Sequence, residues 1–134
     1  SSTVWFQQCH IHSKKNSHVT AASTPKNNPY GYIFNDCILT GDSSLKSVSL
    51  GRPWRPYSSV TYIHCYIDKH IKPGGWSTWN NNENHTTARY AEYKSYGPGS
   101  SSLNRLEWTR QLSETEAKGI TIQEVFGNWK PGFN

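Results

Sequence analysis

The sequence has 134 residues, 34% of them hydrophobic, and carries 6 Trp, 8 Tyr and 4 Phe. This length suits one domain, and its aromatic content supplies enough apolar area for a core, which excludes a disordered chain. The net charge of +5 favours an acidic partner, but no basic cluster is longer than Lys14-Lys15. The composition therefore argues against a nucleic-acid interface and for an acidic polymer such as a polyuronate.

No apolar segment approaches the roughly 20 residues that a membrane span needs, and no signal peptide is evident. Methionine is absent. We therefore expect a processed chain or a piece of a longer one.

Three cysteines mark an internal repeat. Cys9, Cys37 and Cys65 are 28 residues apart (37 − 9 and 65 − 37). Each lies in a similar apolar and polar alternation, FQQCHI at 6–11, FNDCIL at 34–39 and YIHCYI at 62–67, and each copy predicts a strand.

The segments between these strands contain Gly, Pro, Asn and Ser rather than helical patterns, as at 24–29, 40–44 and 72–75. Strands at this period predict a solenoid of stacked turns, a parallel β-helix. The three cysteines should then form a ladder inside the coil. A disulfide between Cys9 and Cys37 is geometrically possible, but three stacked cysteines favour buried apolar filler.

Residues 50–54, with the sequence LGRPW, combine three side chains that suit a carbohydrate site. The guanidinium of Arg52 can grip and ionise a carboxylate, and Pro53 stiffens the backbone beside it. Trp54 can offer a flat face to a sugar ring. The alternative is structural, with Arg52 paired to an acid and Trp54 filling a core.

The pattern loosens after Ile71. Residues 75–79 (GWSTW) and 80–84 (NNNEN) predict long loops leaving the coil, and 87–93 predict another strand. The SETE sequence at 113–116 is a capping box that predicts a short helix ending at Gly119. We expect this helix to close the end of the coil, and 120–123 and 125–129 to finish the chain.

Several polar residues have simpler explanations than catalysis. Asp36, Asp42 and Asp68 are expected in turns or on strand faces. His10 and His12 share a strand face but lack a thiolate or carboxylate at a metal-ligand spacing, and His64 and His70 are expected to be solvated. The Asn-His-Thr triplet at 84–86 is a glycosylation acceptor sequence that also occurs by chance.

Taken together, the motifs resemble the pectin methylesterases of the right-handed parallel β-helix type. The resemblance runs through nearly the whole chain in the family's order. Its elements are LGRPW at 50–54 with Tyr57 and Ser58, IKPGGW at 71–76 with Trp79, YAEY at 90–93, GPG at 97–99, Arg105, Trp108 and GNW at 127–129.

The resemblance implies hydrolysis of galacturonate methyl esters of pectin, to methanol and acidic pectin, with no metal and no organic cofactor. In the family one aspartate attacks the ester, a second acts as general acid and base, and glutamines stabilise the oxyanion. Arg52 matches the arginine that binds the nucleophilic aspartate. Trp54, Tyr57 and Trp76 match residues that line the sugar cleft.

The family's catalytic aspartates and glutamines lie in motifs upstream of the arginine, and none of those motifs is present. Residues 1–9 resemble the segment that directly follows the nucleophile motif. We therefore expect residues 1–134 to be the C-terminal part of a single pectinesterase-like domain, inactive alone, whose missing N-terminal turns belong to the same enzyme. An unpaired first turn near residues 1–9 should also promote self-association.

Two alternatives remain open. A non-catalytic polysaccharide-binding β-helix would explain the aromatic residues and the basic charge without the aspartates. A pectate lyase would need clusters of acids for calcium, which the sequence lacks. We expect pectin as partner, rather than nucleic acid or membrane, and a secreted protein, extracellular or periplasmic, because a polymer cannot enter a cell.

Overall fold

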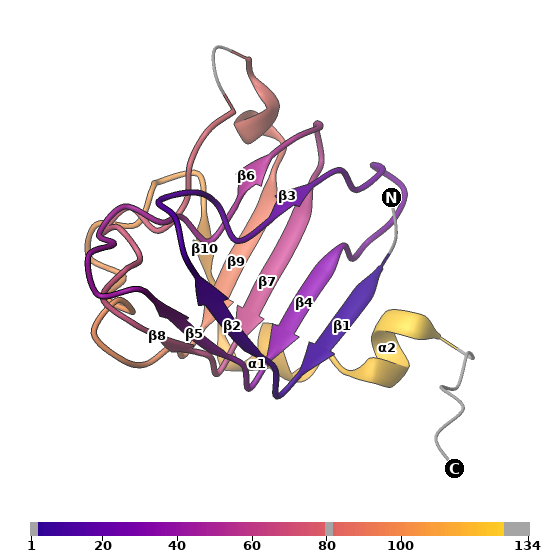
Figure 1. Ribbon diagram of the computed structural model, residues 1–134. Coiled ribbons are helices and arrows are strands. Elements are labelled where there is room, and N and C mark those ends of the chain that lie inside the picture. The colour runs from indigo at the N-terminus through magenta and orange to yellow at the C-terminus, as the bar shows by residue number, and fades with distance from the viewer. Residues whose placement is uncertain (1–2, 80–81, 128–134) are drawn as a thin grey trace.

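The computed structural model describes residues 3–79 and 82–127 of the chain. The predicted parallel β-helix is confirmed: every strand pair is parallel, and the strands of successive turns lie side by side in three sheets (Figure 1). Among the described residues, no helix has the length and apolar character that crossing a membrane requires.

The largest sheet has five strands in the order β1-β4-β7-β9-β10. The second sheet has the order β2-β5-β8, and the third pairs β3 with β6. The bounds of the strands are β1 Val4–Gln7, β2 His10–Ser13, β3 Ala21–Ala22, β4 Tyr32–Asn35, β5 Ile38–Gly41, β6 Arg52–Pro53, β7 Ser59–Ile63, β8 Tyr66–Ile67, β9 Arg89–Tyr93 and β10 Arg110–Gln111.

Each cysteine lies at a sharp corner between two strands, so the prediction of one continuous strand per copy is wrong. The residue before each cysteine has a left-handed backbone, with φ of 53° at Gln8, 54° at Asp36 and 51° at His64. One left-handed residue redirects the chain from the five-stranded sheet into the three-stranded sheet. The repeat of 28 residues therefore describes two strands and a corner.

The cysteine ladder is confirmed, and all three thiols are free. Cys37 and Cys65 are fully buried, and the amide of Cys9 donates to Sγ of Cys37 over 3.4 Å. Burial raises the pKa of Cys65 to about 12. These thiols are therefore neutral and pack as small apolar side chains inside the coil.

A column of aromatic rings runs through the interior beside the cysteines. Phe6, Phe34 and Tyr62 stack at centroid distances of 4.6 Å, one from each turn. Trp76 continues the column, 5.7 Å from Tyr62 and 4.7 Å from Tyr90. Aromatic area thus supplies much of the core, as the composition predicts.

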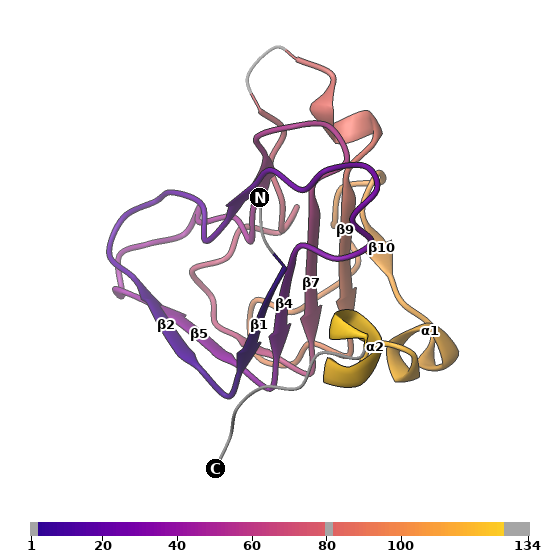
Figure 2. The ribbon, with the colours of Figure 1, turned by 90° about the vertical axis from the view of Figure 1, so that its right-hand side faces the viewer.

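The chain ends in two short helices, α1 (Glu114–Lys118) and α2 (Ile122–Phe126). The predicted capping box is confirmed, because the side chain of Ser113 accepts from the amide of Glu116 and the Glu116 carboxylate accepts from the amide of Ser113. The helices do not close the end of the coil. Figure 2 shows both helices beside the five-stranded sheet, on the side away from β2 and β5. There Ala117 packs with Ile33, Ile63 and Tyr93 in a second core. The apolar side chains on the outer face of the sheet are thereby buried.

The aspartates and histidines lie mostly as expected. Asp36 occupies a corner, and Asp42 and Asp68 accept backbone hydrogen bonds in turns. The expectation for His70 is wrong, because its side chain is only 2% exposed. Its ring fills space against Gly41, where a Cβ atom would lie 2.7 Å from Cγ of His70.

The strand at 87–93 is confirmed as β9, and residues 75–79 form no regular element. The residues at 80–81 and 128–129, which belong to the predicted Asn-rich loop and to the GNW motif, lie outside the described part of the chain.

Candidate active-site segment

Arg52 and Pro53 form β6, which extends along β3 of the previous turn. The amide of Arg52 donates to the carbonyl of Thr20 over 3.1 Å, and that of Trp54 to the carbonyl of Ala22 over 3.0 Å. Pro53 has no N–H, but among the described residues β3 is the only strand paired with β6, so no ladder bond is lost. The backbone therefore holds Arg52 and Trp54 in a fixed relation.

The residue before Arg52 must be a glycine because two turns of the coil come very close there. A Cβ atom on Gly51 would lie 2.2 Å from Oγ1 of Thr20. That hydroxyl and the hydroxyl of Tyr62 both donate to the carbonyl of Leu50, over 3.0 and 2.8 Å. The start of the LGRPW segment is thereby anchored in the core.

The guanidinium of Arg52 has an aromatic partner. Its Cζ atom lies 3.9 Å from the ring centroid of Trp79, and its Nε atom is buried without a hydrogen-bond partner. Within residues 3–79 and 82–127, no carboxylate forms an ion pair with Arg52. The structural alternative, in which Arg52 serves a structural acid, has no support in this part of the chain.

Trp54 is 49% exposed, so it does not fill the core. Its ring stacks on that of Trp79 at 6.2 Å with an interplanar angle of 18°, and Cζ of Arg55 lies 5.6 Å from its centroid. We call Arg52, Trp54, Arg55 and Trp79 the arginine–tryptophan shelf. It combines flat apolar rings with permanent positive charge, which suits an acidic sugar polymer.

Burial of Trp76 argues against its predicted role in binding a sugar. The residues on either side of Trp76 form backbone hydrogen bonds with the LGRPW segment. The amide of Leu50 donates to the carbonyl of Gly75, and the amide of Ser77 donates to the carbonyl of Gly51. Side chains alternate along such an extended segment, and the ring of Trp76 points inward and is fully buried. Trp79, three residues on, lies at the shelf instead.

Tyr57 lies in a turn with a left-handed backbone, φ 65°. Its carbonyl accepts from Nε of Arg89 over 2.9 Å, and Nζ of Lys26 lies 5.2 Å from its ring centroid. Its amide donates to Oγ1 of Thr87 over 3.0 Å. Among the described residues, no ring contact or hydrogen bond joins Tyr57 to Arg52.

The segment from residue 82 onward contacts β6 through Asn84, the first residue of η1 (Asn84–Thr86). The side-chain amide of Asn84 donates to the carbonyls of Pro53 and Trp54, over 3.2 and 3.0 Å. It therefore ties η1 to β6, the strand that contains Arg52 and is labelled in Figure 1. An N-linked sugar would replace one of the two amide hydrogens that this anchor uses.

The shelf is electropositive. Burial, with further contributions from Arg52 and Lys72, lowers the pKa of His18 below 6.5, so this histidine is neutral at pH 7.

His10 and His12 lie on another sheet, where both contact the Thr40 hydroxyl and Nε2 of His12 lies 2.7 Å from Asp42. Asp36 and Asp68 also have no ion pair with Arg52 in the described residues.

One buried ion pair was not predicted from the sequence. Glu92 on β9 forms a two-pronged pair with Arg105, with Nε to Oε2 at 2.8 Å and Nη2 to Oε1 at 3.1 Å. The two side chains are only 1% and 4% exposed. Arg105 also donates to the carbonyls of Pro73 and Gly99, so this buried pair fastens two long turns to the sheet.

Comparison with known proteins matches the family model "Pectinesterase" to residues 1–128. The chain is 39% identical to Pectinesterase 31 of Arabidopsis thaliana over 118 residues, which cover 87% of this chain and 37% of that protein. It resembles the solved pectin methylesterase from carrot with a TM-score of 0.82 and 30% identity, over 92% of this chain and 43% of that one. Another solved pectin methylesterase, in complex with a hexasaccharide, matches at a TM-score of 0.77 and 26% identity, over 97% of this chain and 46% of that one.

The chain thus spans less than half the length of these relatives. The solved structures agree with the parallel β-helix, and the match to the family model spans the segment around Arg52. The chain belongs to the pectinesterase family.

Proposed function

We propose that residues 1–134 form the C-terminal part of a pectin methylesterase domain and supply the arginine and part of the sugar-binding surface of its active site. The complete enzyme hydrolyses galacturonate methyl esters of pectin. The aspartates and glutamines that the family uses for this reaction come from residues outside this sequence. The chain alone therefore has no esterase activity.

One observation carries this proposal: the guanidinium of Arg52 stacks on Trp79 and has no carboxylate partner among the described residues. A partly buried guanidinium without an anion is costly unless an anion occupies the site in the functional state. The nucleophilic aspartate of the family is such an anion. Its pairing with Arg52 would lower its pKa and fix its direction.

The N-terminal end of the coil indicates where the missing catalytic groups would come from. β1, β2 and β3 are edge strands of their sheets. Beside them lies a hollow of about 350 Å³ lined by core-type side chains, among them Phe6, Ile11, Val19 and Phe34. An apolar hollow bordered by three strand edges fits a further turn of the same solenoid. Without that turn, we expect the edge strands to promote self-association.

The substrate assignment rests on the shelf and on the relatives. In the shelf, exposed Trp54 and the guanidinium groups of Arg52 and Arg55 suit an acidic sugar polymer. Tyr57 remains a candidate for contact with the sugar. A solved relative in complex with a hexasaccharide supports an oligosaccharide ligand. Because pectin is a cell-wall polymer, we place the protein outside the cytoplasm, extracellular or periplasmic.

Methanol release from highly methylated pectin tests the proposal. The chain is assayed alone and after co-refolding with the N-terminal part of a pectin methylesterase. We expect no release by the chain alone and release by the mixture. Turnover by the isolated chain would refute the division of the active site.

A second candidate function is polysaccharide binding without catalysis. It is favoured by the exposure of Trp54, which needs no aspartate to hold a sugar ring. Retained binding of pectin by the mixture, with no methanol released under any condition, would favour this function.

A further inference from the structure

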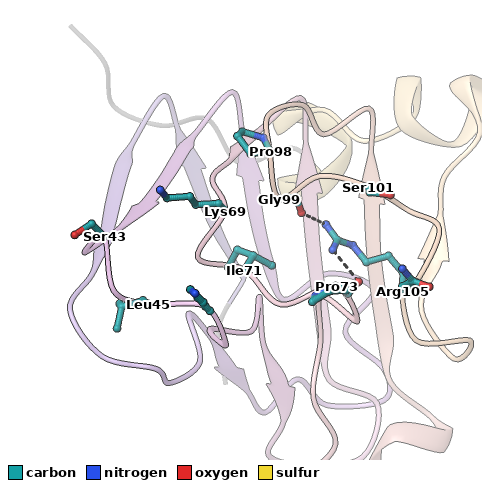
Figure 3. Close-up of a pocket in the computed structure, with 11 residues that line it drawn as sticks. Ser43, Leu45, Lys69, Ile71, Pro73, Pro98, Gly99, Ser101 and Arg105 are labelled. Carbon is teal, nitrogen blue, oxygen red and sulfur yellow. Dashed lines mark hydrogen bonds between the residues drawn. The ribbon is translucent and has the colours of Figure 1, made fainter.

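A cavity of about 480 Å³ lies among three turns that are not part of the shelf. Its walls come from the turn after β5, the turn after β8 and the long segment after Tyr96, as Figure 3 shows. None of the residues that line it is Arg52, Trp54 or Trp79. Its volume lies within the roughly 300–1,000 Å³ typical of small-molecule sites.

All charged side chains that line the cavity are positive. Lys46, Lys69 and Arg105 line the cavity, and no acidic side chain does. Neither lysine forms an ion pair within the described part of the chain. Of the nearby acids, Asp42 contacts His12, and Asp68 accepts from the backbone amide of Lys69 over 2.7 Å but forms no ion pair with either lysine in the described residues. Two lysines are therefore free to hold an anion.

The floor of the cavity is apolar. Leu45 and Ile71 are buried beneath it, and Pro73 and Pro98 lie at its border. Asn104 adds an amide beside this apolar surface. A sugar ring has both apolar C–H faces and polar edges, so this combination suits a sugar better than a simple inorganic anion.

Arg105 is already paired with Glu92, so its role in the cavity is to hold the turns in place rather than to bind an anion. Its guanidinium pairs with the carboxylate of Glu92. It also donates to the carbonyls of Pro73 and Gly99, over 3.2 and 2.8 Å (Figure 3). Two of the three turns are therefore fixed before any ligand arrives. A preformed cavity loses less entropy on binding.

We propose that this cavity binds a uronate unit with a free carboxylate, held by Lys46 and Lys69. The inference rests on the proposed function, because de-esterified pectin is the polymer that presents such units. A methyl ester carries no charge and should bind far more weakly. The cavity would thus hold a de-esterified stretch of polymer apart from the shelf.

Calorimetric titration of the 134-residue chain with trigalacturonate tests this site. The titrations use a Trp54→Ala/Trp79→Ala background, so that the shelf does not contribute. Lys46→Gln/Lys69→Gln should weaken binding about tenfold or more, as expected for losing two charge-assisted contacts. Lys14→Gln/Lys15→Gln removes the same charge elsewhere and should leave the affinity unchanged. Circular dichroism checks that each variant is folded.

Three results would overturn the proposal: equal weakening by both lysine pairs, equal binding of the trimethyl ester, or equally effective displacement by inorganic phosphate. Equal weakening would mean that net charge alone attracts the ligand. Methanol release by the reconstituted mixture is measured separately on a short methylated substrate, which the Lys46→Gln/Lys69→Gln variant should hydrolyse normally. Failure of all mixtures to release methanol would refute the proposed function while leaving the binding result interpretable.

Discussion

Arg52 and Trp79 lie on successive turns of the coil, 27 residues apart, with the guanidinium carbon 3.9 Å from the centre of the indole ring. Trp79 in turn stacks on Trp54. The position of the guanidinium thus depends on a loop, and Asn84 anchors that loop to the carbonyls of Pro53 and Trp54. The shelf is one assembly of strand and loop.

Trp79→Ala should reduce the activity of the reconstituted mixture without unfolding the chain. A cation–π contact of this kind contributes about 1–2 kcal/mol, or roughly 5- to 30-fold in rate. Because the guanidinium would lose its orientation, kcat should fall as well as the affinity for pectin. Trp79→Phe keeps a ring and should recover part of the loss. An unchanged kcat in Trp79→Ala would argue against a positioning role.

Trp76 should behave in the opposite way. Its ring is fully buried between Tyr62 and Tyr90, so Trp76→Ala should lower the free energy of unfolding by about 3–5 kcal/mol. Urea denaturation measures this change. The milder variant Trp76→Phe should remain folded and bind pectin like the parent chain. Loss of binding by a folded Trp76→Phe variant would show that this residue touches the sugar after all.

The contrast between these two tryptophans explains why the site was only partly predictable. Both lie in the segment GWSTW, and only the hydrogen bonds of Gly75 and Ser77 to the previous turn decide which ring points inward. Arg52 and Trp54 could be singled out from residue type and motif. The burial of Trp76 and the partial exposure of Trp79 could not be predicted from residue type.

The fold was more predictable because identical spacing of Cys9, Cys37 and Cys65 encodes stacking directly. The corners were missed because Gln8, Asp36 and His64 adopt a left-handed backbone without being glycines. The pair of Glu92 with Arg105 was missed because a long loop separates them. The alternation of YAEY gave a signal, since it points Glu92 to the same side of the sheet as the inward-facing Tyr90.

Removing one partner of that buried pair should be costly. Arg105→Met leaves the carboxylate of Glu92 buried without its charge partner, which should lower the free energy of unfolding by about 3–5 kcal/mol. Arg110→Met is the matched control, because Arg110 pairs with Glu116 at the surface, where an ion pair contributes less than about 1 kcal/mol. Chemical denaturation compares the two variants. Equal effects would contradict the proposed anchoring role of Arg105.

His70 predicts the direction of a pH effect on stability. Burial lowers its pKa below 6.5 and outweighs the opposite influence of Asp68. As the pH falls through 6.5, the unfolded chain binds a proton that the folded chain does not, so the free energy of unfolding decreases. His70→Leu should reduce this decrease between about pH 7 and pH 5, whereas His10→Asn, at an exposed position, should not. An unchanged slope in His70→Leu would exclude His70 as the source.

Methanol release by the reconstituted mixture carrying Arg52→Met, compared with the parent mixture and with Arg110→Met, tests most directly whether Arg52 completes the active site. Methionine keeps much of the length of arginine but cannot hold a carboxylate. We expect the parent and Arg110→Met mixtures to release methanol, and the Arg52→Met mixture to lose activity by about 100-fold or more. Full activity of the Arg52→Met mixture would show that the arginine does not complete the active site.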